Sequence, residues 1–411
     1  MVHNNPISDF ANQYLEREEQ YGAHNYHPLP VVLNRGEGVN VWDVDGKKYF
    51  DFLSGYSALN QGHCHPRIIA SLIEQAQKLT LTSRAFHSDV LGEYAEYITE
   101  YFGYDKVLPM NTGVEAVETA LKLARRWGYQ VKGIADSKAK IIVCRNNFHG
   151  RTISVISFST DDGARNEFGP FTPGYTIIPY NDLDALKTAL QDKNVAAFLV
   201  EPIQGEAGVI VPDEGYLQKA AAMCNAANVL FVADEIQTGL ARTGKMLACD
   251  FEDVKPDILI LGKALSGGTI PVSAVLANND IMLTIKPGEH GSTYGGNPLA
   301  CKVAITALQV LKDEAMAENS AVQGLRFRKG IQEMKHGNIG LVRGKGLLNA
   351  IVIDHPVENT AWDLCLAMKD RGLLAKPTHG DKIRFAPPLL ITGTQIDDCL
   401  EIIYQSLQSI S

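Results

Sequence analysis

Five short runs of apolar residues recur along the middle of the chain, and stretches long enough for a helix separate most of them. Such runs are typical of strands that are buried on both faces. Because parallel strands need long crossover connections, the alternation predicts an α/β fold with a mostly parallel sheet covered by helices. The predicted strands are KIIVC (140–144), AAFLV (196–200), VLFVA (229–233), DILIL (257–261) and PVSAVLA (271–277).

One segment that precedes these runs follows the helical period. In VEAVETALKLARRW, residues 114–127, the charged side chains lie mostly off the apolar stripe, which predicts an amphipathic helix. The residues on the stripe are Val117, Ala120, Leu121, Ala124 and Trp127.

The length of the chain and a change in its pattern predict two domains. A chain of 411 residues exceeds what one hydrophobic core usually supports. After about residue 297 the pattern changes to helices followed by short strands, near 347–353 and 382–386. A turn signal, Asp45-Gly46, predicts an early hairpin. The expected divisions are an N-terminal segment (1–50) that packs with the smaller domain, a larger domain (51–296) and a smaller α+β domain (297–411).

Charge and cysteine content restrict the partners. The formal net charge of -9 provides no basic field for nucleic acid or anionic lipid, so we expect small-molecule partners and neither nucleic acid nor membrane. Seven dispersed cysteines indicate free thiols in a reducing compartment. The first residues are acidic and contain no apolar run, so we expect the cytoplasm, or the mitochondrial matrix if a presequence was removed.

Two of the predicted strands end in polar residues. VLFVADEIQTG runs into Asp234 and Glu235, and DILILGKALSGG runs into Lys263. Adjacent side chains of a strand point to opposite faces, so one of the two acids faces a cavity and the other is structural. Since ligands bind at the carboxyl ends of parallel strands, Asp234 and Lys263 could share one site. Taken singly, each has an ordinary alternative, a turn acid and a solvated lysine.

Two segments could hold a phosphate group. In MNTGVEA, residues Asn111, Thr112 and Gly113 directly precede the amphipathic helix, and free N–H groups at a helix start bind anions. The alternative is an ordinary helix cap. HGSTYGGNP adds the hydroxyls of Ser292 and Thr293, or is simply a glycine-rich loop. GKALSGG lacks the P-loop spacing, so a nucleoside triphosphate site is disfavoured.

Two further segments follow predicted strands and carry recognition chemistry. NNFHGRT contains Phe148, whose ring can stack on a flat ligand, and Arg151, whose guanidinium can bind a carboxylate through two bonds. A core phenylalanine and a surface arginine are the alternative. EPIQGEAG adds Glu201 and Glu206. The residues of QGHCHP lie too close together to ligate one ion, so we expect a turn and no metal.

The order of these features is what a pyridoxal 5'-phosphate enzyme needs. A lysine forms the Schiff base, an acid holds the pyridine nitrogen protonated, and the ring then withdraws electrons from a carbanion. The chain resembles, over essentially its whole length, the class III aminotransferases of fold type I. The resemblance rests on MNTGVEA, NFHGRT, EPIQGEAG, DEIQTGLARTG, GKALSGG and HGSTYGGNP. YGAHNYHPLPV, LTSRAF, KPGEHGSTYGGNPLA, RGKGLLNAIV and GLLAKPTHGDKIRFAPPL are similar to the branch that acts on ornithine.

The resemblance implies pyridoxal 5'-phosphate as cofactor and a role for each matching residue. Lys263 would carry the cofactor and move the proton, and Asp234 would pair with the ring nitrogen. Ser292 and Thr293 would come from a neighbouring subunit, which implies a homodimer or a higher homo-oligomer. The other residues implied to contact the cofactor are Thr112, Gly113 and Val114 at the phosphate, Phe148 and Ile236 on the ring faces, and Gln237 at the ring oxygen.

The resemblance also implies a reaction. The δ-amino group of ornithine would pass to 2-oxoglutarate, giving glutamate and glutamate 5-semialdehyde, which cyclises to pyrroline-5-carboxylate. Other ω-amino donors (N-acetylornithine, 4-aminobutyrate or lysine) and a catalytically silent homologue stay open. His149 stands where some ornithine enzymes have tryptophan, and it does not discriminate between these alternatives. The residues implied to bind substrate are Tyr26, Tyr56, Arg151, Glu201, Glu206 and Arg384.

Overall fold

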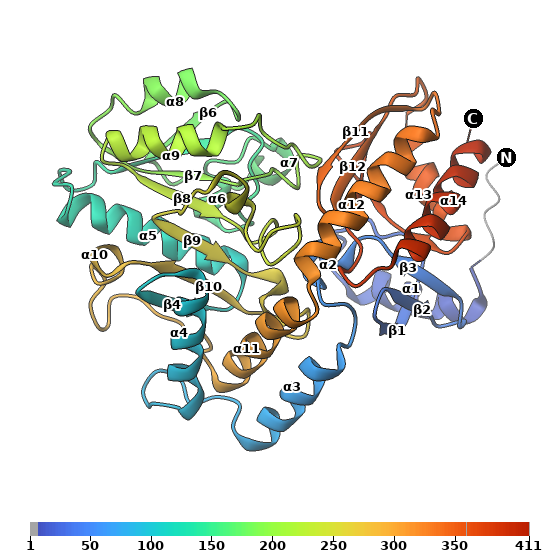
Figure 1. The fold of residues 1–411 in the computed structure, drawn as a ribbon, viewed down its shortest axis with the longest axis horizontal. Helices are drawn as coiled ribbons and strands as arrows, with labels where there is room; N and C mark the ends of the chain where they lie inside the picture. Colours follow the sequence, from blue (N-terminus) through green and yellow to red (C-terminus); the bar gives the residue numbers. More distant parts are fainter. Residues whose placement is uncertain (1–6, 359, 411) are drawn as a thin grey trace.

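The structure is a computed structural model, which describes residues 7–358 and 360–410. It has two lobes that lie side by side, and both ends of the described part of the chain, residues 7 and 410, lie on the smaller lobe (Figure 1). Within the described residues, the larger lobe is built on a seven-stranded sheet and the smaller lobe on two four-stranded sheets. The α/β fold predicted from the apolar runs is confirmed.

The sheet of the larger lobe has the strand order β4-β10-β9-β8-β7-β5-β6. Its strands from β9 to β6 are parallel, as predicted. β10 differs, because it pairs antiparallel with both β9 and β4. The short connection from β9 to β10 contains no crossover helix, and a parallel partner would require one. The strands are β4 Lys106–Met110, β5 Lys140–Cys144, β6 Tyr175–Ile178, β7 Val195–Val200, β8 Leu230–Asp234, β9 Ile258–Leu261 and β10 Ser273–Ala277.

Helices cover both faces of this sheet, and the strands alternate between the two layers. Ile141 and Val143 pack in the cluster that contains α5 (Gly113–Gln130). Ile142, between them, packs in the cluster that contains α8 and α9. The predicted helix over 114–127 is confirmed as part of α5, and its whole apolar stripe is buried. The other helices on this sheet and its loops are α6 Ile153–Ile156, α7 Asp162–Arg165, α8 Leu183–Ala189, α9 Tyr216–Ala226 and α10 Asn279–Met282, with the 3-10 helices η1 Ala248–Glu252 and η2 Lys263–Ser266.

The helix α11 (Pro298–Asp313) belongs to the larger lobe by its packing. It lies against α3 (Pro66–Lys78) and α4 (Asp89–Phe102) at the foot of that lobe (Figure 1). The next helix, α12 (Met316–Glu333), packs instead on α14 and β11 of the smaller lobe. The division at residue 297 stays a prediction, and this packing favours a boundary in the turn between α11 and α12.

The smaller lobe combines segments from both ends of the chain. β2 and β3 form the predicted antiparallel hairpin, with Gly46 at a φ of 84° in its turn. β13 pairs parallel with β3, so a strand near residue 373 extends the N-terminal sheet. This pairing supports the proposal that residues 1–50 pack with the smaller domain. The elements are α1 Asp9–Tyr21, β1 Leu33–Glu37, β2 Asn40–Asp43, β3 Lys48–Asp51, α2 Ser54–Ser57, β11 Ile339–Lys345, β12 Leu348–Ile353, α13 Thr360–Asp370, β13 Leu373–Leu374, β14 Lys376–Thr378, β15 Lys382–Phe385 and α14 Gly393–Ser409.

The state of the cysteines and the length of the helices relate to the environment of the protein. All seven cysteines are free thiols; Cys64 is exposed and the other six are buried. Among residues 7–358 and 360–410, no helix is both long enough and apolar enough to cross a lipid bilayer.

Arg242 is a fully buried cation between the two lobes. Its Nε and Nη2 atoms donate to Asn60 Oδ1 at 3.0 and 2.6 Å. Its Nη1 atom donates to the carbonyl oxygens of Leu347 at 3.0 Å and Pro387 at 2.6 Å. Burial lowers the pKa of Arg242 to about 9, so the guanidinium stays charged at neutral pH. One side chain therefore joins the loop after β8 to segments that follow α2, β11 and β15.

Replacing this cation should weaken the whole fold. Arg242→Met removes the donors and leaves three buried oxygens unpaired, which costs about 3 kcal/mol of unfolding free energy. We expect the unfolding temperature in calorimetry to fall by several degrees. The control is Arg326→Ala, which breaks an exposed ion pair with Asp397 and should leave the unfolding temperature unchanged. Equal unfolding temperatures for Arg242→Met and the wild type would contradict this role.

Candidate active site

The loops at the carboxyl edge of the parallel strands enclose an inner cavity of about 190 Å³. β8 ends at Asp234, β9 leads directly into Gly262 and Lys263, and the loop after β5 carries Phe148. Since parallel strands present their carboxyl ends at one edge, these residues meet although they are far apart in sequence. The lining residues are Gly113, Val114, Phe148, His149, Gly150, Glu201, Glu206, Asp234, Ile236, Gln237, Thr238 and Lys263.

Asp234 is buried, and both of its carboxylate oxygens have partners. Oδ2 lies 2.6 Å from His149 Nδ1, and Oδ1 accepts a bond from the Ile236 N–H at 3.1 Å. Burial acts to lower the pKa of His149, but the bond to Asp234 and its charge outweigh burial, and the net pKa is raised. His149 and the Ile236 N–H therefore hold the Asp234 carboxyl group in one orientation. Sequence reasoning missed this role, because nothing in NNFHGRT indicates a contact 85 residues away.

Two other buried carboxyl groups support the site. Glu201 Oε1 accepts a bond from the Phe148 N–H at 2.9 Å, and burial raises the pKa of Glu201 to about 7. Glu201 thus lines the inner cavity and positions the loop that carries Phe148. Glu235 points to the other face of β8, where it bonds Thr238 and the Cys249 N–H. Its structural environment agrees with the alternation predicted for the two acids.

Lys263 is the first residue of η2, at the inner end of the cavity. Its φ of 44° lies in the left-handed region, which a lysine rarely adopts, and such strain is typical of functional positions. Burial lowers its pKa to about 8. A substantial fraction of the amine is therefore neutral near pH 8 and can act as a nucleophile or a base.

The start of α5 leaves two N–H groups available for an anion. Thr112 caps the helix, and the Glu115 carboxylate accepts bonds from the N–H groups of Asn111 at 3.0 Å and Thr112 at 2.7 Å. Within the described part of the chain, no hydrogen bond uses the N–H groups of Gly113 and Val114. Both residues line the inner cavity, so the helix can present these donors and its positive end to a phosphate group.

Ser292 and Thr293 lie on a loop beside this helix start. Ser292 Oγ accepts a bond from Asn111 Nδ2 of the same chain at 2.8 Å, and Thr293 is exposed. Neither residue lines the inner cavity. Their predicted contribution to the phosphate site of a neighbouring subunit stays a prediction.

The inner cavity fits a flat ligand with a polar edge. Phe148 and Ile236 both line it, and a Cβ atom at Gly113 would come within 3.1 Å of Ile236 Cδ1. Gln237 Oε1 is buried and has no hydrogen-bond partner among the described residues. The site thus offers two free helix N–H groups that suit the phosphate of pyridoxal 5'-phosphate, and an acid that suits its ring nitrogen. The Gln237 amide suits the ring oxygen and Lys263 the aldehyde.

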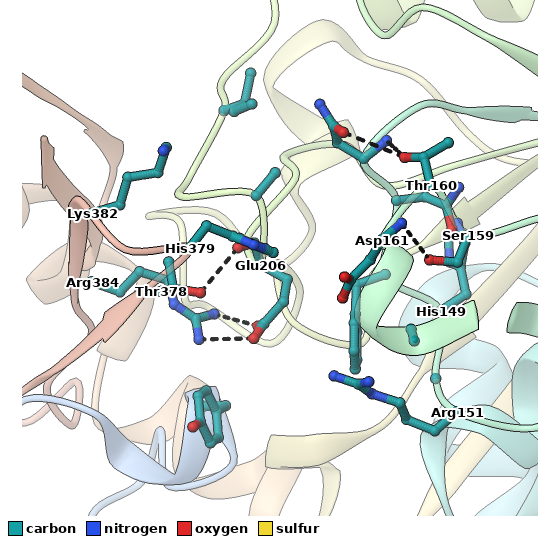
Figure 2. A pocket seen from close by; sticks show the side chains of 18 of the residues that line it. His149, Arg151, Ser159, Thr160, Asp161, Glu206, Thr378, His379, Lys382 and Arg384 are labelled. Carbon is teal, nitrogen blue, oxygen red and sulfur yellow. Dashed lines mark hydrogen bonds and ion pairs between the residues drawn. The ribbon is translucent and has the colours of Figure 1, made fainter. Parts of the chain in front are cut away.

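An outer cavity of about 760 Å³ adjoins the inner one and shares Phe148, His149 and Glu206 with it. Arg384 on β15 enters from one wall and makes a paired contact with Glu206, with Nη1–Oε2 at 2.6 Å and Nη2–Oε1 at 3.2 Å (Figure 2). Arg151 enters from the opposite wall (Figure 2). No carboxylate of the described chain lies within ion-pair distance of Arg151. Besides Arg343, whose guanidinium donates to the Gly208 carbonyl oxygen, the outer cavity thus contains one guanidinium masked by a carboxylate, Arg384, and one unmasked, Arg151.

The remaining predicted residues occupy different places. Tyr56 lines the outer cavity, and its ring lies under the Arg384 guanidinium at 5.0 Å. Its φ of 59° belongs to a left-handed run over 54–57 that the sequence did not predict. Tyr26 is 77% exposed and lines neither cavity. Thr112 borders a neighbouring cavity that also includes Lys263. The sequence did not single out Asp161, Arg343, Lys376, His379 and Lys382, which also line the outer cavity.

Comparisons with known proteins agree with this site. The model of the family "Aminotransferase class-III" matches residues 21–407. The mitochondrial ornithine aminotransferase of Rattus norvegicus is 63% identical over 97% of this chain and 91% of its own length. Its counterpart in Drosophila melanogaster is 62% identical over 96% and 91%.

Solved structures show the same architecture. An ornithine aminotransferase of Toxoplasma gondii, described with partial occupancy of PLP at its active site, has a TM-score of 0.96 and 51% identity, and the alignment covers 97% of this chain and 94% of that one. An acetylornithine aminotransferase of Elizabethkingia anophelis has a TM-score of 0.89 and 60% identity, with 97% and 99% covered. By this similarity over nearly its whole length, the chain belongs to the class III aminotransferases, the family whose cofactor is pyridoxal 5'-phosphate.

Proposed function

We propose that this protein transfers the δ-amino group of L-ornithine to 2-oxoglutarate, giving glutamate and glutamate 5-semialdehyde, which cyclises to pyrroline-5-carboxylate. The observation that carries the proposal is the pair of guanidinium groups on opposite walls of the outer cavity, of which only Arg384 is masked, by Glu206. Relatives named ornithine aminotransferase are 54 to 63% identical to this chain, which supports the same substrate. The reaction would link arginine metabolism to proline biosynthesis.

The residues of the inner cavity would hold one cofactor, and one of them, Lys263, would carry the proton. Pyridoxal 5'-phosphate supplies an aldehyde that accepts an amino group and a ring that withdraws electrons. Asp234, fixed by His149, would hold the ring nitrogen protonated, and Gln237 would bond the ring oxygen. Lys263, whose pKa of about 8 leaves much of it neutral, would take the proton from the reacting carbon and return it.

Arg151 would determine which end of ornithine reacts. Its unmasked guanidinium would bind the α-carboxylate through two bonds, far from Lys263. The Tyr26 hydroxyl would contact the α-amino group. Glu206, bonded to Arg384, cancels the attraction of that guanidinium for the same carboxylate. The δ-amino group then lies nearest the reaction centre.

In the second half of the reaction Arg384 would change partners. A dicarboxylate such as 2-oxoglutarate carries a second carboxylate, which can replace Glu206 on Arg384 with similar geometry. Arg151 would then bind the γ-carboxylate. The Tyr56 ring lies under the Arg384 guanidinium. It would stay in contact with that cation and keep the guanidinium in its orientation when Glu206 leaves.

N-acetylornithine is the second candidate donor. The relative of Elizabethkingia anophelis that is named for acetylornithine is 60% identical to this chain. The outer cavity of about 760 Å³ has room for an acetyl group as well as the amino acid. The two donors differ in the acetyl group on the α-nitrogen and in the charge of that nitrogen, which the acetyl group removes.

We also propose a homodimer and the cytoplasm for this protein. The dimer follows from the expected contribution of Ser292 and Thr293 to the phosphate site of a neighbouring subunit. The seven free thiols fit a reducing compartment such as the cytoplasm, whereas the relatives of Rattus norvegicus and Drosophila melanogaster are named mitochondrial.

The reaction is tested by supplying ornithine and 2-oxoglutarate and trapping pyrroline-5-carboxylate with o-aminobenzaldehyde. We expect the trapped product from ornithine and, measured by the glutamate formed from 2-oxoglutarate, much less turnover of N-acetylornithine, 4-aminobutyrate or lysine. Lys263→Ala, which lacks the reacting amine, should form no product. Faster turnover of N-acetylornithine than of ornithine would assign the second candidate instead.

Glu206→Ala should separate the two half-reactions. Without its mask Arg384 attracts the α-carboxylate of any amino acid, so the glutamate half-reaction should become faster and the ornithine half-reaction slower by about tenfold or more. Single-turnover absorbance traces measure each half-reaction. The control is Glu214→Ala, an exposed residue outside both cavities that loses the same charge. Equal slowing of both half-reactions would leave Glu206 a structural partner only.

Lys263 in the cofactor-free protein should react as an unusually acidic ammonium group. Because burial lowers its pKa to about 8, the neutral amine appears as the pH rises through 8 rather than through the ordinary value near ~10.4. Competition labelling with acetic anhydride, read by peptide mass spectrometry, gives the midpoint. The same lysine in urea-unfolded protein is the control. Identical midpoints in the folded and unfolded protein would show that burial has no effect.

A further inference from the structure

Asp161 presents an uncommitted carboxylate oxygen to the outer cavity. It caps α7, where Oδ1 accepts a bond from the Gly163 N–H at 3.0 Å, and its own N–H donates to Ser159 Oγ at 3.1 Å. Within the described residues, Oδ2 has no hydrogen bond and no cation lies within ion-pair distance of the group. Since one oxygen is enough for the cap, the other is available to a ligand.

Asp161 and Arg151 share one wall of this cavity. Both line it, and Figure 2 shows the carboxylate and the guanidinium pointing from the same side toward the wall that carries Glu206 and Arg384. The Arg151 guanidinium is steadied by the Phe148 ring, 5.5 Å below it. An unmasked cation and a half-used anion thus line the same cavity, on the side opposite Arg384.

We propose that Asp161 binds the α-ammonium group of the amino donor while Arg151 binds its α-carboxylate. The inference rests on the proposed function and adds a specificity-determining residue to it. The far end of ornithine is a zwitterion, and a cation and an anion on one wall match its two charges. An ammonium group with three donors is bound better by a carboxylate than by a neutral hydroxyl. The exposed Tyr26 hydroxyl supplies no such charge.

This pairing would select among donors that Arg151 alone treats alike. 5-Aminovalerate has the carboxylate and the reacting amine of ornithine but no α-ammonium group, and the α-nitrogen of N-acetylornithine is a neutral amide. Both lose the bond to Asp161. 2-Oxoglutarate presents only a carboxylate at this end. Asp161 therefore forms no favourable contact with 2-oxoglutarate and repels its carboxylate weakly. The contribution of Asp161 is therefore confined to the first half-reaction.

The alternative is that Asp161 only caps α7, and Asp161→Asn separates the two roles. Asparagine caps a helix as well as aspartate does, so the fold is kept while the negative charge is lost. The matched control is Asp182→Asn. Asp182 caps α8 through a bond from the Ala185 N–H at 2.8 Å and lines neither cavity, so this variant loses the same charge from the same kind of cap.

The experiment compares half-reactions of the wild type and the two variants loaded with cofactor. For Asp161→Asn we expect kcat/KM for ornithine to fall roughly ten- to a hundredfold, mainly through KM. The rates with 5-aminovalerate and with glutamate should stay within about threefold, because neither donor uses the lost charge. Calorimetric binding of ornithine to Lys263→Ala, with and without Asp161→Asn, should show the same loss of affinity without turnover. Asp182→Asn should behave as the wild type throughout.

Two results would overturn the assignment. An unchanged kcat/KM for ornithine in Asp161→Asn, at an unchanged unfolding temperature, would limit Asp161 to its cap. A fall of the same size with ornithine, 5-aminovalerate and glutamate would show a general disturbance of the wall. Failure of the proposed function is distinguishable, because the wild type itself would then not turn over ornithine.

Discussion

The buried guanidinium of Arg242 is the contact on which the geometry of the site depends. Its four hydrogen bonds join the loop that follows Asp234, the last residue of β8, to three acceptors: Asn60 just beyond the turn of Tyr56, Leu347, and Pro387 just beyond Arg384. Segments that carry residues of the inner cavity and of the outer cavity are thereby held by one rigid group. A charge so deeply buried is tolerated because carbonyl and amide oxygens satisfy it on all sides.

The sequence predicts those parts of the fold and site that local pattern controls. The buried strands and the apolar stripe of α5 can be recognised in the sequence because burial gives each a characteristic spacing of apolar residues. Asp234 and Lys263 can be recognised because they are polar residues at the carboxyl ends of such strands. The antiparallel direction of β10 and the bond between His149 and Asp234 leave none, since both arise from long-range packing. Arg242 is invisible for a related reason: an arginine in a glycine-rich loop is ordinarily exposed.

The inner and outer cavities differ in what controls their charged groups. In the inner cavity burial disfavours charge, so the pKa of Lys263 falls to about 8, and the contact with His149 fixes the orientation of Asp234. In the outer cavity the charges stay, and it is their pairing that differs, with Arg384 masked and Arg151 open. Reactivity is thus controlled by desolvation and orientation by ion pairing, on adjoining surfaces that share Glu206.

The parallel pairing of β3 with β13 has a consequence for how the chain folds during synthesis. Bonds from Phe50 to Gly372 and from Phe52 to Leu374 join segments separated by more than 300 residues. At about 5–20 residues per second, a ribosome needs on the order of tens of seconds to supply the later strand. The seven-stranded sheet is complete well before then. The N-terminal hairpin therefore waits with an unpaired edge, the kind of surface that chaperones protect, until the last part of the chain emerges.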